Sequence, residues 1–121
     1  MSRPITVWTE IPVTDMTRAC DFYAKVFDYE MKVDDSGPDP MAVFNGAMDT
    51  AGGHLYPGTP AGGAGNTVHL ALACDLETGI ARCAEAGGEV LSPPISIPSG
   101  RFVYARDSEG NSIGLFEPAA A

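Results

Sequence analysis

Apolar residues along the chain follow two spacings, one typical of strands and one typical of helices. Residues 7–13 are apolar and β-branched enough to predict a strand. Asp15 follows this segment and can cap a helix over residues 16–27. The apolar side chains that recur there at helical spacing are Ala19, Phe22, Tyr23, Val26 and Phe27. The pattern therefore predicts a helix with one face in a hydrophobic core.

Three shorter apolar segments follow this helix, near residues 29–33, 41–45 and 53–56, with turn-forming residues between them. We expect each of them to be a strand. Gly and Pro are then concentrated at about residues 58–66, which predicts a linker. The glycines of this linker have no strand–GxxxxGK–helix context, so the segment does not indicate a phosphate-binding loop.

The same order of elements begins again after the linker. A strand is expected over residues 68–74, and Asp75 can cap a second helix to about residue 86. The strands expected after this helix lie near residues 89–91, 101–106 and 112–116.

The two halves also match residue by residue. The pairs at an offset of 60 are Asp15-Met16 with Asp75-Leu76, and His54-Leu55-Tyr56 with Gly114-Leu115-Phe116. Trp8 matches His69 at an offset of 61, which implies one extra residue before the first helix. A nearly constant offset across strands and helix predicts an α+β fold of two tandem βαβββ modules, about residues 5–57 and 67–118.

Charge and composition narrow the classes of partner. Seven Lys and Arg residues against 16 Asp and Glu residues give a net charge of -9. No basic stripe is present, so the sequence predicts neither nucleic acid nor an anionic membrane as a partner. No apolar run approaches the roughly 20 residues of a membrane span. The stretch Met1–Pro4 has no apolar core for a signal peptide, so we expect a cytoplasmic protein.

The cysteines are Cys20, Cys74 and Cys83. An odd number without CxxC spacing indicates neither a disulfide framework nor a zinc site. We expect all three to be small buried apolar side chains.

Three stretches resemble the vicinal oxygen chelate superfamily, which includes glyoxalase I, extradiol dioxygenases and bleomycin-resistance proteins. Residues 15–27 resemble its first helix, residues 68–72 its fifth strand and residues 107–118 its last hairpin. The resemblance implies one glyoxalase-like domain over residues 1–121, in which two modules curve eight strands into a cup. It also favours a homodimer, because the family often pairs modules across chains and two short modules would leave strand edges exposed.

Metal-binding members of this superfamily carry ligands at four strand positions. In this sequence the resemblance places them at Trp8, His54, His69 and Gly114. An indole has no lone pair for a metal and glycine has no side chain, so two imidazoles remain. Stable divalent sites generally need three or four protein ligands. Alternation along the strand puts Glu10 on the same face as Trp8. His54, His69 and Glu10 are therefore the candidate metal ligands.

Several side chains have more than one interpretation. Trp8 is either a wall that stacks on a planar ligand or a core side chain. Glu10 is either a general base in a pocket or the partner of Arg101 or Arg106 in an ion pair. Arg101 either holds an anionic substrate group or is a solvated loop residue. Glu117 is a weaker candidate metal ligand, because its parity is opposite to that of Gly114.

Three functions remain as hypotheses, and binding of a small molecule in the cup is common to them. The first is a lyase, isomerase or dioxygenase that uses a divalent metal. The second is a protein that binds or sequesters its ligand without a metal. The third is acid–base catalysis, with Glu10 and His69 as the candidate catalytic residues. The residues expected to bind the ligand are Trp8, His54, Tyr56, Gly114 and Phe116. We expect both histidines to face one cavity. Whether the protein uses a divalent metal or no cofactor at all stays open.

Overall fold

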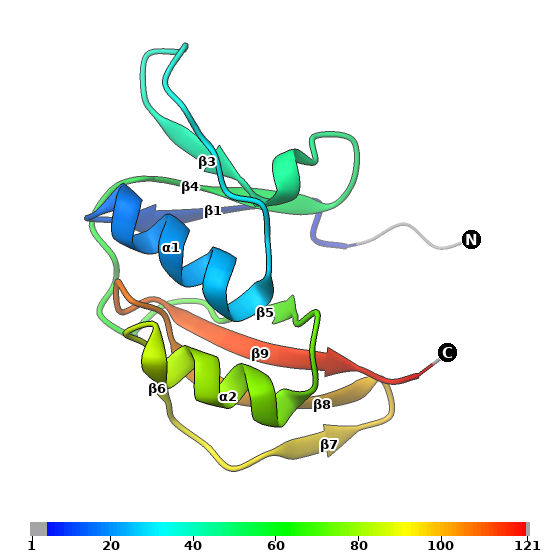
Figure 1. Cartoon of the computed structure of the whole chain (residues 1–121). Helices are drawn as coiled ribbons and strands as arrows, with labels where there is room; N and C mark the ends of the chain where they lie inside the picture. Colours follow the sequence, from blue (N-terminus) through cyan, green and yellow to red (C-terminus); the bar gives the residue numbers. More distant parts are fainter. Residues whose placement is uncertain (1–4, 121) are drawn as a thin grey trace.

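The structure, a computed structural model, describes residues 5–120 as two modules, each a helix packed on its own sheet (Figure 1). Met1–Pro4, on which the expected location in the cell rests, and residue 121 lie outside the described residues. The first module contains β1 (Trp8–Val13), α1 (Met16–Phe27), β2 (Val33–Asp34), β3 (Met41–Val43), the short 3-10 helix η1 (Phe44–Gly46) and β4 (Gly52–Pro57). Its sheet has the strand order β1-β4-β3-β2, with β1 and β4 parallel.

The second module has the same order of elements with one more strand. It contains β5 (Val68–Ala71), α2 (Leu76–Glu85), β6 (Glu89–Val90), β7 (Ile95–Ile97), β8 (Gly100–Arg106) and β9 (Ser112–Pro118). Its sheet has the order β5-β9-β8-β6, and β7 also pairs with β8. The parallel pair β5–β9 corresponds to β1–β4 of the first module.

The α+β class and the tandem modules are confirmed, with two differences in the strands. The described strands form a four-stranded and a five-stranded sheet instead of one eight-stranded cup. Within residues 5–120, the strands of each module pair only with one another. The sequence did not predict β7, since residues 95–97 lie between prolines, which favour loops and sheet edges. The strand expected near residues 29–33 is reduced to β2.

Aspartate side chains begin both helices, as predicted. The side chain of Asp15 accepts a hydrogen bond from the backbone N–H of Arg18 at 3.0 Å. The side chain of Asp75 accepts one from the N–H of Thr78 at 2.8 Å. Each carboxylate thereby satisfies an N–H of the first turn, which has no partner within its helix. Neither helix of the described region is long and apolar enough to cross a bilayer.

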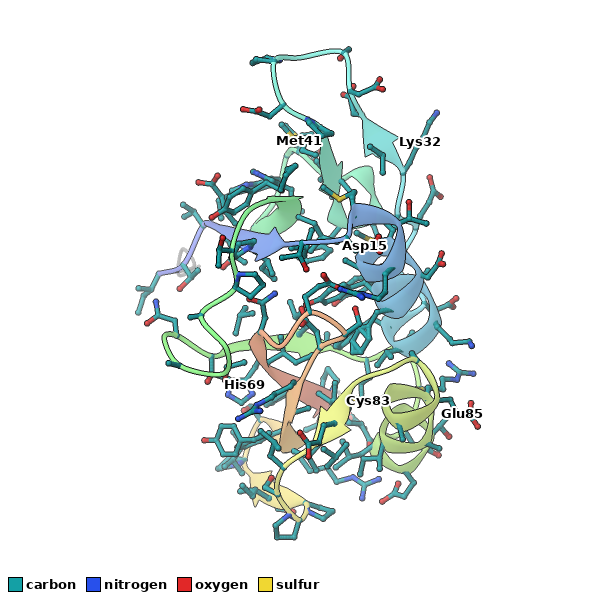
Figure 2. The ribbon with its side chains drawn as sticks, turned by 90° about the vertical axis from the view of Figure 1, so that its left-hand side faces the viewer. Asp15, Lys32, Met41, His69, Cys83 and Glu85 are labelled. Atoms are coloured by element: carbon teal, nitrogen blue, oxygen red, sulfur yellow. The ribbon has the colours of Figure 1, made fainter. Side chains whose placement is uncertain are left out.

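The two helices lie side by side and cover the same side of the molecule (Figures 1 and 2). The predicted apolar face of α1 is confirmed, because Ala19, Phe22, Tyr23, Val26 and Phe27 are all fully buried. The strands contribute Ile11, Leu55, Val103, Ile113 and Leu115 to the same core. Cys20 and Cys83 are buried there as free thiols, as expected, whereas Cys74 is only half-buried.

Polar contacts from the turn between β8 and β9 fix the second module against the first. The phenol of Tyr23 donates to the buried carboxylate of Asp107 at 2.6 Å. The carboxylate of Glu109 accepts from the backbone N–H of Asp15 at 2.9 Å and from Arg18 Nε at 2.6 Å. The side-chain amide of Asn111 donates to the carbonyl oxygen of Pro12 at 2.8 Å. These contacts hold α1 and β1 in place relative to the second sheet.

Candidate functional site

Each sheet has one face under the helices and one face away from them. Alternate residues of β1 and β4 turn Ile11 and Leu55 toward the helices, where both are buried. The opposite set comprises Trp8, Glu10, His54 and Tyr56, which we call the first free face. In the second sheet the corresponding set is His69, Phe102, Tyr104 and Phe116, which we call the second free face. Strand parity thus divides these candidate side chains between two faces.

Trp8 and His54 are joined by a hydrogen bond on the first free face. The indole Nε1 of Trp8 donates to Nδ1 of His54 at 2.9 Å. Nδ1 must therefore be unprotonated, which assigns the proton of a neutral imidazole to Nε2. Nε2 of His54 lies 3.5 Å from a carboxylate oxygen of Glu10. His54 is largely enclosed, with 12% of its side chain exposed, whereas 66% of the Glu10 side chain is exposed.

This geometry decides between the earlier interpretations of Trp8 and Glu10. Trp8 is half-buried and lies outside the hydrophobic core, so it is not a core side chain. Glu10 lines an open cavity, and 66% of its side chain is exposed. Its proposed pairing with Arg101 is wrong, because Arg101 donates to Glu77 at 2.6 Å and to Glu117 at 2.9 Å.

The same ion pairs exclude two further roles. Arg101 is neither a solvated loop residue nor free to hold an anionic substrate, because two carboxylates already occupy its guanidinium. Glu117 also accepts from the backbone N–H of Leu76 at 2.8 Å, so its carboxylate serves the start of α2. It is therefore not directed at the second free face.

His69 is an exposed residue that lies against three aromatic rings on the second free face. The centre of its imidazole lies 4.8 Å from that of Phe102, 5.6 Å from Tyr104 and 6.3 Å from Phe116, all edge to face. The partial burial by these rings lowers the pKa of His69. On the other side the imidazole lies directly over Gly114. A β-carbon at that position would overlap the ring, approaching Cε1 to 2.5 Å.

The strand register corrects one part of the internal match. Glu10 is paired with His54 across β1 and β4, and His69 is paired with Gly114 across β5 and β9. Because His54 corresponds to Gly114, the structural counterpart of His69 is Glu10 and not Trp8. The sequence match favoured Trp8 because it aligned Val7 with Val68. The structure instead leaves Val7 outside β1 and 65% exposed.

The structure divides the candidate residues between the two sheets. It brings Glu10 and His54 together with Trp8 and Tyr56, and the centres of the His54 and Tyr56 rings lie 6.3 Å apart. His69 lies on the other sheet, in the lower half of the view in Figure 2, whereas Met41 of β3 marks the first sheet above it. The two histidines therefore lie on different sheets of the chain. Among residues 5–120, no three His, Cys, Asp or Glu side chains gather closely enough to hold a metal ion.

Two acidic residues with a clear structural role were missed from the sequence. Asp107 and Glu109 belong to what looked like an ordinary hairpin turn, but their carboxylates meet side chains of the first module. The guanidinium of Arg18 lowers the pKa of Glu109 to about 2. Their partners lie more than 80 residues away in the chain, and no local pattern indicates such contacts.

Comparison with known proteins identifies the class. The family model of the Glyoxalase/Bleomycin resistance protein/Dioxygenase superfamily matches residues 5–115. The chain belongs to this superfamily, which confirms the resemblance seen in its sequence.

Individual relatives refine the comparison. "Putative glyoxylase CFP32" of Mycobacterium tuberculosis is 28% identical over 116 residues, which are 93% of this chain and 44% of that protein. The chain thus spans less than half the length of this relative. A glyoxylase/bleomycin resistance protein/dioxygenase domain from Frankia sp. EAN1pec superimposes with a TM-score of 0.69 at 18% identity, over 98% of this chain and 99% of that one. TnmS3, an antibiotic binding protein from Streptomyces sp. CB03234, superimposes with a TM-score of 0.62 at 26% identity, with the same coverage.

Proposed function

We propose that the protein binds a small, planar organic molecule on its free faces and that its own side chains do so without a metal. The observation that carries this proposal is the hydrogen bonding of the His54 imidazole, one of the expected metal ligands. Nδ1 of His54 already accepts the indole N–H of Trp8, and Nε2 of the same ring carries the proton. A metal needs an imidazole lone pair, so this arrangement leaves His54 with none to offer.

The second free face fits a metal no better. Its two ligand positions are His69 and Gly114, and the imidazole of His69 fills the space that a side chain at position 114 would need. The residues present therefore do not match the donor set of a metal-dependent lyase or dioxygenase. They do offer aromatic walls, since Tyr104 and Phe116 lie beside His69 and keep part of their surface in solvent.

One relative supports binding over catalysis. TnmS3, at 26% identity over nearly the whole chain, is named as an antibiotic binding protein. A planar antibiotic or another aromatic metabolite is the kind of ligand that flat aromatic side chains would contact.

We further propose a homodimer in which the first free face of one copy closes over the second free face of the other. Tyr104, Leu91 and Ile97 of the second module are 41%, 49% and 43% exposed, so this sheet leaves apolar surface in solvent. A facing copy would cover this surface and give a ligand two walls. Light scattering at micromolar concentration should give twice the chain mass, and a monomer would contradict the dimer.

Fluorescence of Trp8, the only tryptophan in the chain, tests ligand binding directly. Titration with a set of planar aromatic compounds should quench or shift this emission with saturation for at least one of them. Tyr104→Ala should weaken that binding, whereas Tyr29→Phe, which keeps its ring against Phe27 and Phe44, should not. Stoichiometric metal that stays bound through purification and is lost in His69→Ala would instead favour the metal-dependent enzyme.

A further inference from the structure

A cavity of about 590 Å³ opens beside the first free face, and its lining is acidic. Strands β1 and β4 contribute Glu10, His54 and Tyr56, and residues 34 and 36–41 form most of the remaining lining. Three of the lining residues, Glu10, Asp34 and Asp39, are carboxylates, and none of the described lining residues is Lys or Arg. A neutral or anionic ligand would gain nothing from such a wall, whereas a cation would.

Hydrogen bonds stabilise the negative charge of one of these carboxylates. The hydroxyl and backbone N–H of Ser36 both donate to Asp34, which lowers the pKa of that carboxyl. Among the described residues, Glu10 pairs with His54, whose Nε2 lies 3.5 Å from its carboxylate. Other carboxylates have true counter-ions: Glu109 pairs with Arg18, and Glu77 and Glu117 pair with Arg101. Glu10 instead lines the cavity beside a histidine, which is a counter-ion only when it is protonated.

Trp8 keeps His54 from acting as that missing counter-ion. Its indole N–H points at Nδ1 of His54, and protonation of that nitrogen would place two N–H groups against each other. The bond therefore favours a proton on Nε2, the nitrogen nearest Glu10. His54 can donate a hydrogen bond to the Glu10 carboxylate without cancelling its charge. Trp8 acts here as a positioning residue that turns the N–H of His54 toward the Glu10 carboxylate.

We propose that this cavity takes the cationic group of the ligand, a protonated amidine or amine attached to a planar aromatic body. The cation would lie at the Glu10 carboxylate, with Asp34 and Asp39 adding to the negative field. The ring of Tyr56, which also lines the cavity, offers a face for the cation or for the aromatic body. The inference rests on the proposed function and adds the charge of the ligand to it.

Three probes of one shape and different charge test this inference: 2-naphthamidine as the cation, 2-naphthamide as the neutral compound and 2-naphthoate as the anion. Isothermal titration calorimetry of the protein should rank their affinities in that order, with the amidine ahead of the amide by about tenfold, as expected for a hydrogen bond to a charged group. Glu10→Gln should remove this preference. The side chain of Glu10 is 66% exposed, so the variant should fold normally. Glu85→Gln makes the same charge change at an exposed position outside the cavity and should keep the preference.

The outcomes separate the two proposals. Equal binding of all three probes, or tighter binding of the naphthoate, would overturn the cationic class and leave small-molecule binding intact. A preference for the amidine that survives in Glu10→Gln would overturn the assignment to Glu10. Failure of all three probes to bind at millimolar concentration would count against the proposed function itself.

Discussion

The imidazole of His69 lies on the α-carbon of Gly114, in the space that a β-carbon would occupy. The two residues are paired across the parallel strands β5 and β9. In the metal-binding arrangement expected from the family, both positions would carry ligands that point at one ion. Here the glycine makes room for the histidine, and the histidine packs among the aromatic rings of the second free face.

This packing predicts a strong coupling between positions 69 and 114. Gly114→Ala should destabilise the protein by about 1–3 kcal/mol, because the added methyl group displaces a ring that is held on its other side. In a His69→Ala background the same change should cost much less. Urea unfolding of the four proteins in this double-mutant cycle measures the coupling. Additive effects would show that the imidazole does not lie on Gly114.

The lowered pKa of His69 predicts a loss of stability on acidification. The ordinary histidine pKa is 6.5, and that of folded His69 is lower. As the pH falls through 6.5, the unfolded chain binds the proton first, so the free energy of unfolding decreases until the folded imidazole is also protonated. Above 6.5 both forms are neutral and this contribution vanishes. His69→Gln should lose less stability than the wild type between about pH 7.5 and about pH 5. An identical pH dependence in the two proteins would contradict the shift.

Glu109 is predicted to lock the two modules together. Its side chain is fully enclosed and accepts hydrogen bonds from Thr14, the N–H of Asp15 and Arg18. Glu109→Gln should lower the free energy of unfolding at neutral pH by about 2–3 kcal/mol, since it weakens several charge-assisted hydrogen bonds. Glu85→Gln is the matched control on the exposed end of α2 and should change little.

Acid titration gives an independent check on Glu109. Its pKa is lowered from 4.5 to about 2 in the folded state, so its contribution is present above 4.5 and is lost as the pH falls toward 2. The wild type should therefore lose more stability over this window than Glu109→Gln does. Parallel curves for the two proteins would show that the carboxylate is not held by Arg18.

The hydrogen bond from Trp8 to His54 predicts a single tautomer. Long-range proton–nitrogen NMR spectra at neutral pH should show Nδ1 of His54 unprotonated and Nε2 protonated. Trp8→Phe removes the donor and should produce a mixture of tautomers, while the spectrum of His69 stays unchanged. A proton on Nδ1 of His54 in the wild type would contradict the account of the first free face.

Much of the fold was predictable because its signals are local. The capping aspartates Asp15 and Asp75 and the apolar spacing between residues 16 and 27 depend on neighbours in sequence, and the structure has both helices where these signals place them. Parity along β1 and β4 likewise indicated which side chains lie on a free face. Strand β7 escaped prediction because the flanking prolines indicate a loop more strongly than three residues indicate a strand.

The site was less predictable because it depends on the register between paired strands and on the directions in which individual side chains point. A shift of two residues between β1 and β4 decides whether Trp8 or Glu10 is paired with His54. No sequence pattern shows that an indole N–H would meet Nδ1 of His54, or that the imidazole of His69 would turn onto Gly114. The modules also meet through Asp107 and Glu109, so the separation of the two free faces follows from contacts between distant parts of the chain.

Ligand titration with and without a metal chelator tests the central claim most directly. A planar aromatic compound that binds by Trp8 fluorescence should be titrated in EDTA, in buffer alone, and with added nickel, manganese, iron or zinc. The account predicts the same dissociation constant in EDTA and in buffer, with no increase in affinity from any of the metals. Binding that disappears in EDTA, returns with one of these metals and is absent in His69→Ala would contradict it.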